Sequence, residues 1–104
     1  MSEIINVDND NMPDLTTGTF LIDYYADFCG PCKVLAPILT EISLERDDVT
    51  ILKVNIDRNV ELTKKAGIRG IPAVFVFKDG AMITSKVGFS SKSAIVAMID
   101  QAAA

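Results

Sequence analysis

Residues Phe20–Cys32 read FLIDYYADFCGPC and combine features that together constrain the fold. The run Phe20–Tyr25 is aromatic and β-branched, which is typical of a buried central strand. Two cysteines, Cys29 and Cys32, follow it closely. The apolar residues after Cys32 recur at the spacing of one helical face, and Pro31 suits the first turn of such a helix. The cysteine pair is therefore expected between the end of a strand and the start of a helix.

Strands and helices are predicted to alternate along the rest of the chain. Asp57 is a candidate cap for a short helix, and the connection Lys78-Asp79-Gly80 indicates a hairpin. The other predicted elements are a short strand at Ile4–Val7, a helix from Cys32 to about Ser43, a strand at Thr50–Ile56, a helix ending near Ala66, strands at Ala73–Phe77 and Ala81–Val87, and a closing helix carrying Ala94–Ala102. This order predicts an α/β fold, with a mixed central sheet covered by helices on both faces.

Length and charge limit the classes of function. The 104 residues suit one domain, residues 1–104, with an apolar core. The net charge of −4 includes no basic stripe, so nucleic acid is not an expected ligand. No stretch approaches a membrane span, and residues 1–6 lack the pattern of a signal peptide. We therefore expect a cytoplasmic protein that does not bind membranes, and a monomer.

Two neighbouring cysteines in a reducing compartment indicate redox chemistry or metal binding. A zinc site needs four ligands, and the chain has two cysteines and no histidine, so an ordinary site within one chain is excluded. A cluster bridged between two subunits, an inert structural disulfide and a chance pair of buried thiols remain alternatives.

The position of the pair favours catalysis. Amide groups at a helix amino terminus stabilise a thiolate, which makes Cys29 the expected nucleophile. Cys32, one turn further, lies close enough to form a disulfide with Cys29 and to resolve a mixed disulfide with a substrate. Gly30 permits close approach of a substrate backbone, and Pro31 fixes the turn and removes an amide donor, which favours a reductant over a strong oxidant.

Asp23 is unusual because a carboxylate within an apolar strand costs desolvation energy unless it is paired or protonated. Burial should raise its pKa, so Asp23 is a candidate acceptor for the proton that Cys32 must lose. Lys53 lies in the middle of a predicted strand and is a candidate neighbour of Asp23 across the sheet. The alternative is an exposed Asp23 at a sheet edge with a solvated Lys53.

The segment Gly70-Ile71-Pro72 directly precedes a predicted strand, which suits a turn. Its sequence position does not reveal the isomer of the Ile71–Pro72 bond, since few X–Pro bonds are cis. A cis bond here would present backbone groups to an extended substrate.

The chain resembles the thioredoxin family in several motifs, whose order and spacing run through nearly its whole length. They are Asp23–Lys33 (DYYADFCGPCK), Ala36–Leu39, Lys53–Asp57, Gly67–Pro72 and Lys86–Gly88.

This resemblance implies the thioredoxin fold and a protein-disulfide reductase that binds no cofactor, cycles its own disulfide and receives electrons from NADPH through thioredoxin reductase. Its partners would be that reductase and disulfide-containing client proteins. By position, Cys29 would attack and Cys32 resolve, while Asp23 would be the buried carboxylate and Lys53 its neighbour. The resemblance also implies a cis Pro72 and an apolar docking surface at Phe28, Gly30, Pro31, Ile56, Gly70, Ile71, Pro72, Val87 and Gly88, although Ile56 and Val87 have core positions as an alternative.

The chain departs from the family in having no tryptophan. Tyr25 and Phe28 stand where the family usually has Trp, so aromatic packing is kept and an indole N–H donor is lost at each position. The segment before Phe20 is also short for the family, which predicts a vestigial first helix. The rival functions are a non-catalytic accessory subunit that binds another enzyme, and an oxidant or isomerase.

Overall fold

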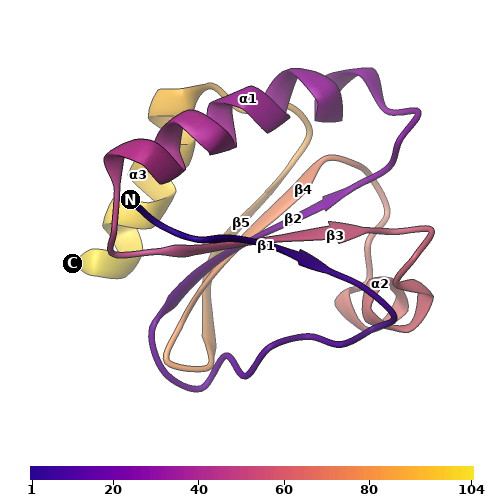
Figure 1. The fold of residues 1–104 in the computed structure, drawn as a ribbon, viewed down its shortest axis with the longest axis horizontal. Helices are drawn as coiled ribbons and strands as arrows, with labels where there is room; N and C mark the ends of the chain where they lie inside the picture. The colour runs from indigo at the N-terminus through magenta and orange to yellow at the C-terminus, as the bar shows by residue number, and fades with distance from the viewer.

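The strand predicted at the cysteine motif is central to the sheet. In the computed structural model, which describes residues 1–104, it is β2 (Thr19–Tyr25), the middle strand of a five-stranded sheet ordered β1-β3-β2-β4-β5 (Figure 1). The other strands are β1 (Ile4–Val7), β3 (Thr50–Asn55), β4 (Ala73–Lys78) and β5 (Ala81–Val87). β3 pairs in parallel with β1 and β2, while β4 is antiparallel to both β2 and β5. The predicted mixed sheet is confirmed.

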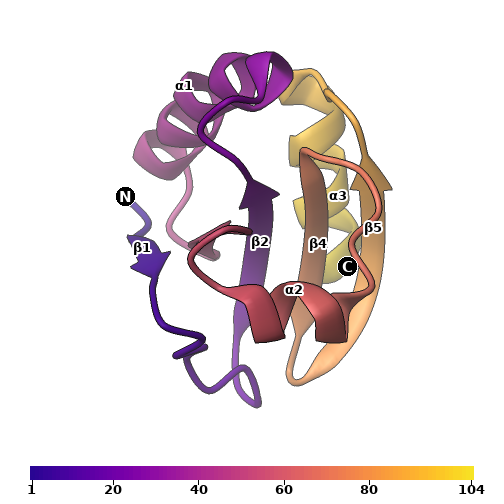
Figure 2. The same cartoon turned by 90° about the vertical axis from the view of Figure 1, so that its right-hand side faces the viewer.

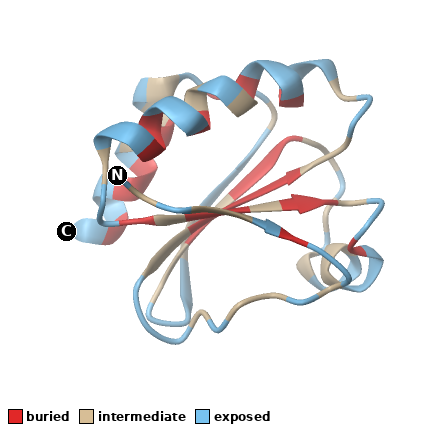
Figure 3. Ribbon diagram, viewed as in Figure 1, coloured by how far each residue is buried: buried red, intermediate tan, exposed pale blue.

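Helices cover both faces of this sheet. α1 (Gly30–Glu45) and α3 (Lys92–Ala103) pack on one face, and α2 (Val60–Ala66) lies on the other (Figures 1 and 2). Each face has its own apolar core: one joins Leu21 and Ile51 to both long helices, and the other joins Ile22 and Leu52 to the α2 side. Figure 3 shows the buried residues of α1 and α3 turned toward the sheet. No helix is both long enough and apolar enough to cross a membrane.

Alternation along β2 determines where its polar residue points. Leu21 belongs to the core beneath α1 and α3, whereas Ile22 and Tyr24 belong to the core on the opposite face. Since side chains alternate along a strand, Asp23 and Tyr25 share the face of Leu21. Asp23 therefore faces the layer that contains the helix carrying Cys32.

Two predicted boundaries move by a few residues. α1 begins at Gly30 and ends at Glu45, longer at both ends than the apolar pattern indicated. Its end residues are exposed and so add nothing to the buried apolar face; they are Gly30, Pro31, Leu44 and Glu45. The hairpin has a two-residue connection, Asp79-Gly80, since Lys78 still belongs to β4 and pairs with Ala81 of β5. Both connecting residues have positive φ, 50° and 85°, the conformation that a two-residue hairpin requires and that Asp-Gly favours.

The prediction that Asp57 caps α2 is wrong. The helix begins at Val60, and the residue before it, Asn59, makes no side-chain cap bond to the helix. A carboxylate oxygen of Asp10 instead accepts the backbone N–H of Leu62 at 3.0 Å. The helix amino terminus is thus satisfied by a residue 52 positions away in the chain.

The segment that supplies this cap contains no helix. Residues 8–18 form turns and irregular structure between β1 and β2, in agreement with the expected loss of the first helix of the family. Asn59 is fully buried, and its side chain ties this segment down by accepting the N–H of Asp10 at 2.9 Å and donating to the carbonyl of Val7 at 2.9 Å. Polar contacts therefore fix the connection to the α2 side of the sheet.

Candidate active site

The two cysteines lie at the start of α1 and are joined in a disulfide, with their Cα atoms 5.2 Å apart. Cys29 is the cap residue of the helix, and its sulfur accepts the backbone N–H of Cys32 at 3.1 Å. Such a donor stabilises negative charge on sulfur once the disulfide is reduced. Cys29 is partly exposed and Cys32 is 4% exposed, so the two residues differ in their access to solvent and clients.

Asp23 is buried in the centre of the sheet, which excludes the alternative of an exposed edge residue. It is 1% exposed, and neither carboxylate oxygen has a hydrogen-bond partner. Burial raises the pKa of the Asp23 carboxyl from 3.8 to about 6, and the positive charge of Lys53 opposes part of that rise. The group can therefore change its protonation state near neutral pH.

Lys53 lies directly opposite Asp23, because the two residues are register partners in the parallel pair of β2 and β3. The expected proximity is confirmed, but the two side chains form no ion pair within 4 Å. The Lys53 ammonium lies over the ring of Tyr25, 4.8 Å from its centroid. Tyr25 and Lys53 line a cavity of about 140 Å³ together with Cys32, so the cavity links the lysine to the inner cysteine.

Strand register gathers the predicted docking residues at one end of the sheet. Tyr24 pairs with Ala73, and Ala73 pairs with Val87, so the end of β2, the start of β4 and the end of β5 lie side by side (Figure 2). The loop from β2 to Cys29 leaves from this end. Pro72, which precedes β4, follows a cis peptide bond as the resemblance implied, and its carbonyl accepts the N–H of Gly88 at 2.7 Å.

The docking residues differ in their exposure. Phe28 is 95% exposed and Val87 is 64% exposed, while Gly30 and Pro31 are also exposed at the start of α1. Ile56 is half-buried and packs against the core on the α2 side, so it serves that core in part. Gly70 lies against Val87, since a Cβ at position 70 would be 2.9 Å from a Val87 methyl carbon.

Phe89 is an apolar residue at this end of the sheet that the motifs did not predict. It directly follows Gly88 and is 47% exposed. The sequence signal that could have identified Phe89 is its place in the short connection between a strand and a helix. A large apolar side chain there belongs neither to the strand pattern nor to the helix pattern.

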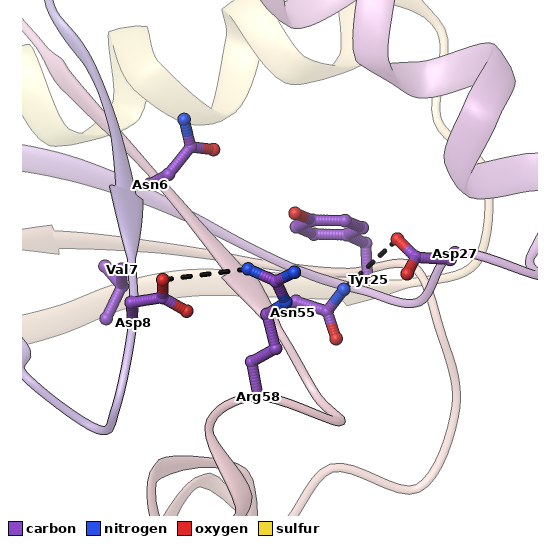
Figure 4. A pocket seen from close by; sticks show the side chains of 7 residues that line it. All are labelled: Asn6, Val7, Asp8, Tyr25, Asp27, Asn55 and Arg58. Carbon is purple, nitrogen blue, oxygen red and sulfur yellow. Dashed lines mark hydrogen bonds and ion pairs between the residues drawn. The ribbon is translucent and has the colours of Figure 1, made fainter.

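A polar groove of about 370 Å³ lies beside the cysteine loop, on the β1 side of the sheet (Figure 4). Asn6 and Asp8 line it from the β1 side, and Arg58 approaches Asp8 at 3.7 Å. On the opposite side, the amide of Asn55 donates to Asp27 at 3.2 Å, which braces the loop between Tyr25 and Cys29. Sequence reasoning missed this brace, because its two residues come from different parts of the chain. The groove contains neither cysteine.

Comparison with known proteins agrees with this geometry. The thioredoxin family model matches residues 3–101. The chain is 44% identical over 84 residues to a thioredoxin of Pseudomonas aeruginosa, covering 80% of this chain and 78% of that protein. It is 37% identical over 101 residues to a thioredoxin of Chlamydia caviae, covering 97% and 98%.

Solved structures show the same likeness. A reduced thioredoxin of Schistosoma mansoni superposes with a TM-score of 0.85 at 30% identity, covering 96% of this chain and 98% of the other. A mutant thioredoxin of Halobacterium salinarum superposes with a TM-score of 0.82 at 31% identity, covering 94% and 88%. From the sequence match, the shared fold and the cysteine pair at the start of α1, we conclude that the chain belongs to the thioredoxin family and is a thiol–disulfide oxidoreductase.

Proposed function

We propose that the chain reduces disulfides in client proteins, with Cys29 as the attacking residue and Cys32 as the resolving residue. The observation that carries this assignment is the difference between the two sulfurs: Cys29 is partly exposed and accepts a helix N–H, whereas Cys32 is 4% exposed. A client sulfur can reach the first and not the second.

The reaction conserves atoms and electrons. The Cys29 thiolate attacks a client disulfide, which forms a mixed disulfide and releases one client thiolate. Cys32 then loses its proton and attacks the Cys29 sulfur, which forms the Cys29–Cys32 bond and releases the second client sulfur. Two electrons pass from the dithiol to the client, and the chain becomes oxidised.

Asp23 is the proposed acceptor of the Cys32 proton. It faces the helix layer that carries Cys32, its carboxylate has no other partner, and its pKa of about 6 makes it a usable base near neutral pH. Lys53 favours the ionised carboxylate from the opposing strand. Both residues would act during the second step.

The docking surface would bind an extended client segment. Phe28 and Val87 expose large apolar area, and the loop of Gly70, Ile71 and Pro72 lies beside Val87 and Gly88. An apolar surface next to a reactive sulfur suits clients whose disulfide is flanked by apolar residues.

The electrons would come from NADPH through thioredoxin reductase, in the cytoplasm, with the chain acting as a monomer in electron transport and redox homeostasis. Membership of the thioredoxin family supports this proposed pathway. It is tested by following NADPH oxidation during insulin reduction with thioredoxin reductase, in parallel with glutathione and glutathione reductase. Turnover with the first donor system supports the proposal, while turnover with glutathione alone contradicts it.

Trapping separates the cysteine roles and the rival function. Cys32→Ser should accumulate mixed disulfides with clients, and Cys29→Ser should form none. Equal trapping by both variants would contradict the assigned roles. Full biological activity in both variants would instead identify the chain as an accessory subunit that works by binding.

A further inference from the structure

The side chain of Lys53 has two competing partners. Asp23 lies opposite it in the strand register, and the Tyr25 ring lies two residues further along β2 on the same face. The ammonium occupies the position over the ring, 4.8 Å from its centroid, and makes no ion pair with the carboxylate. Its charge is therefore held beside Asp23 without neutralising it directly.

The ring offers a real alternative to the carboxylate. A cation over the face of an aromatic ring is attracted by the ring quadrupole, most strongly where water is excluded. Lys53 is half-buried, and the cavity that it lines with Tyr25 and Cys32 holds about 140 Å³. Asp23 does not line this cavity, but it is the register partner of Lys53 in the parallel pair of β2 and β3. An ammonium that leaves the ring is therefore attracted by the carboxylate on the neighbouring strand.

The groups that face Asp23 are few. Tyr25 shares its sheet face on β2, and Lys53 is its register partner on β3. Cys32 belongs to α1, which packs on this face, while the register partner on β4 is Val74, which does not titrate. The exposed residues Asp27 and Lys33 also line the cavity and carry opposite charges. Lys53 is the one cation among these groups that lies in register with the carboxylate.

We propose that Tyr25 is a positioning residue, whose ring holds the Lys53 ammonium away from the Asp23 carboxylate and so keeps Asp23 able to exchange a proton with Cys32. This inference rests on the proposed role of Asp23 in the resolution step. It assigns to Tyr25 a function beyond aromatic packing: the ring determines how much of the lysine charge reaches the buried acid.

The test measures the ionisation of Asp23 directly, by following the chemical shift of its side-chain carboxyl carbon against pH in the oxidised protein. Tyr25→Leu removes the ring face, so Lys53 should pair with Asp23 and lower its pKa by about one. Tyr25→Phe keeps a ring face of similar charge distribution and serves as the matched control, with the pKa expected to remain at its original value. The pH profile of mixed-disulfide resolution should shift in the same direction in Tyr25→Leu.

A second background separates the lysine from simple hydration of the acid. When Tyr25→Leu is added to Lys53→Met, the pKa of Asp23 should stay the same as in the Lys53→Met single variant. An equal fall in that background would overturn the proposal, because water entering the enlarged cavity would then explain the change. An unchanged or raised pKa in Tyr25→Leu would also overturn it. The carboxyl titration does not require Asp23 to act as a base, so its outcome is independent of the proposed mechanism.

Discussion

Replacing Asp23 by asparagine should change how stability depends on pH. The folded protein holds the carboxyl with a pKa of about 6, against an ordinary value of 3.8. Below pH 3.8 the carboxyl is protonated in both the folded and the unfolded chain, so it does not lower the free energy of unfolding. As pH rises toward 6, the unfolded chain ionises while the folded chain keeps its proton, so stability falls. Well above pH 6 the carboxyl is ionised in both states, and the loss is complete.

The size of this loss follows from the two pKa values. Their difference, at about 1.4 kcal/mol for each pH unit, corresponds to a total of about 3 kcal/mol. Because Asp23 is 1% exposed, solvent screening reduces this figure little. Roughly half of this stability should be lost by pH 5 and nearly all of it by pH 7. The free energy of unfolding should therefore fall by about 2.5 kcal/mol between pH 4 and pH 7 because of Asp23.

The assay is guanidinium unfolding of the oxidised protein at pH 4, 5, 6 and 7. The measured quantity is the difference in unfolding free energy between Asp23→Asn and the parent chain. This difference should grow in favour of the variant by about 2.5 kcal/mol over that range. A constant cost of burying the asparagine amide affects all pH values alike, so it does not alter the slope.

Asp47→Asn is the matched control, because Asp47 is exposed and forms no ion pair. It removes the same charge from the surface, so it accounts for the change in net charge. Parallel stability curves for the parent and Asp23→Asn would refute the reasoning, since they would mean that folding leaves the ionisation of Asp23 unchanged. A difference that shrinks as pH rises would refute the sign.

Three further outcomes are expected. The rate of mixed-disulfide resolution should fall as pH drops through about 6, and Asp23→Asn should remove this inflection and slow the step roughly 100-fold, as measured by stopped-flow with a labelled client. Asp10→Ala should lower the unfolding free energy by about 1–2 kcal/mol, because it deletes the acceptor for the Leu62 N–H and places alanine at φ 58°. Asp10→Asn should lower the unfolding free energy less, since asparagine retains an acceptor and tolerates that conformation. Gly70→Ala should lower kcat/KM for protein clients by pushing a methyl group against Val87, and the same change should matter less when measured in a Val87→Ala background; an equal loss in both would exclude the clash as the cause.

Much of the active site could be predicted from local sequence. The strand at Phe20–Tyr25, the helix after Cys32 and the cysteine pair between them depend on side-chain periodicity and on contacts within a few residues. The apolar neighbours of Asp23 in the strand favoured its burial but left an exposed edge position open. The central place of β2 in the sheet decided between the two.

Tertiary structure decided the relations between distant segments. The Asp23–Lys53 pairing depends on strand register, and a slip of one residue would place Lys53 on the opposite face. Asp57 had the right residue type to cap α2, but the cap position of that helix is Asn59. Asp10 reaches the helix end from a loop 52 residues before Leu62. The sequence also could not predict the position of the Lys53 ammonium over Tyr25, because that position depends on the pairing of two strands. Local patterns determine which elements form and which residues carry the chemistry, whereas the partners of a buried charge depend on how those elements assemble.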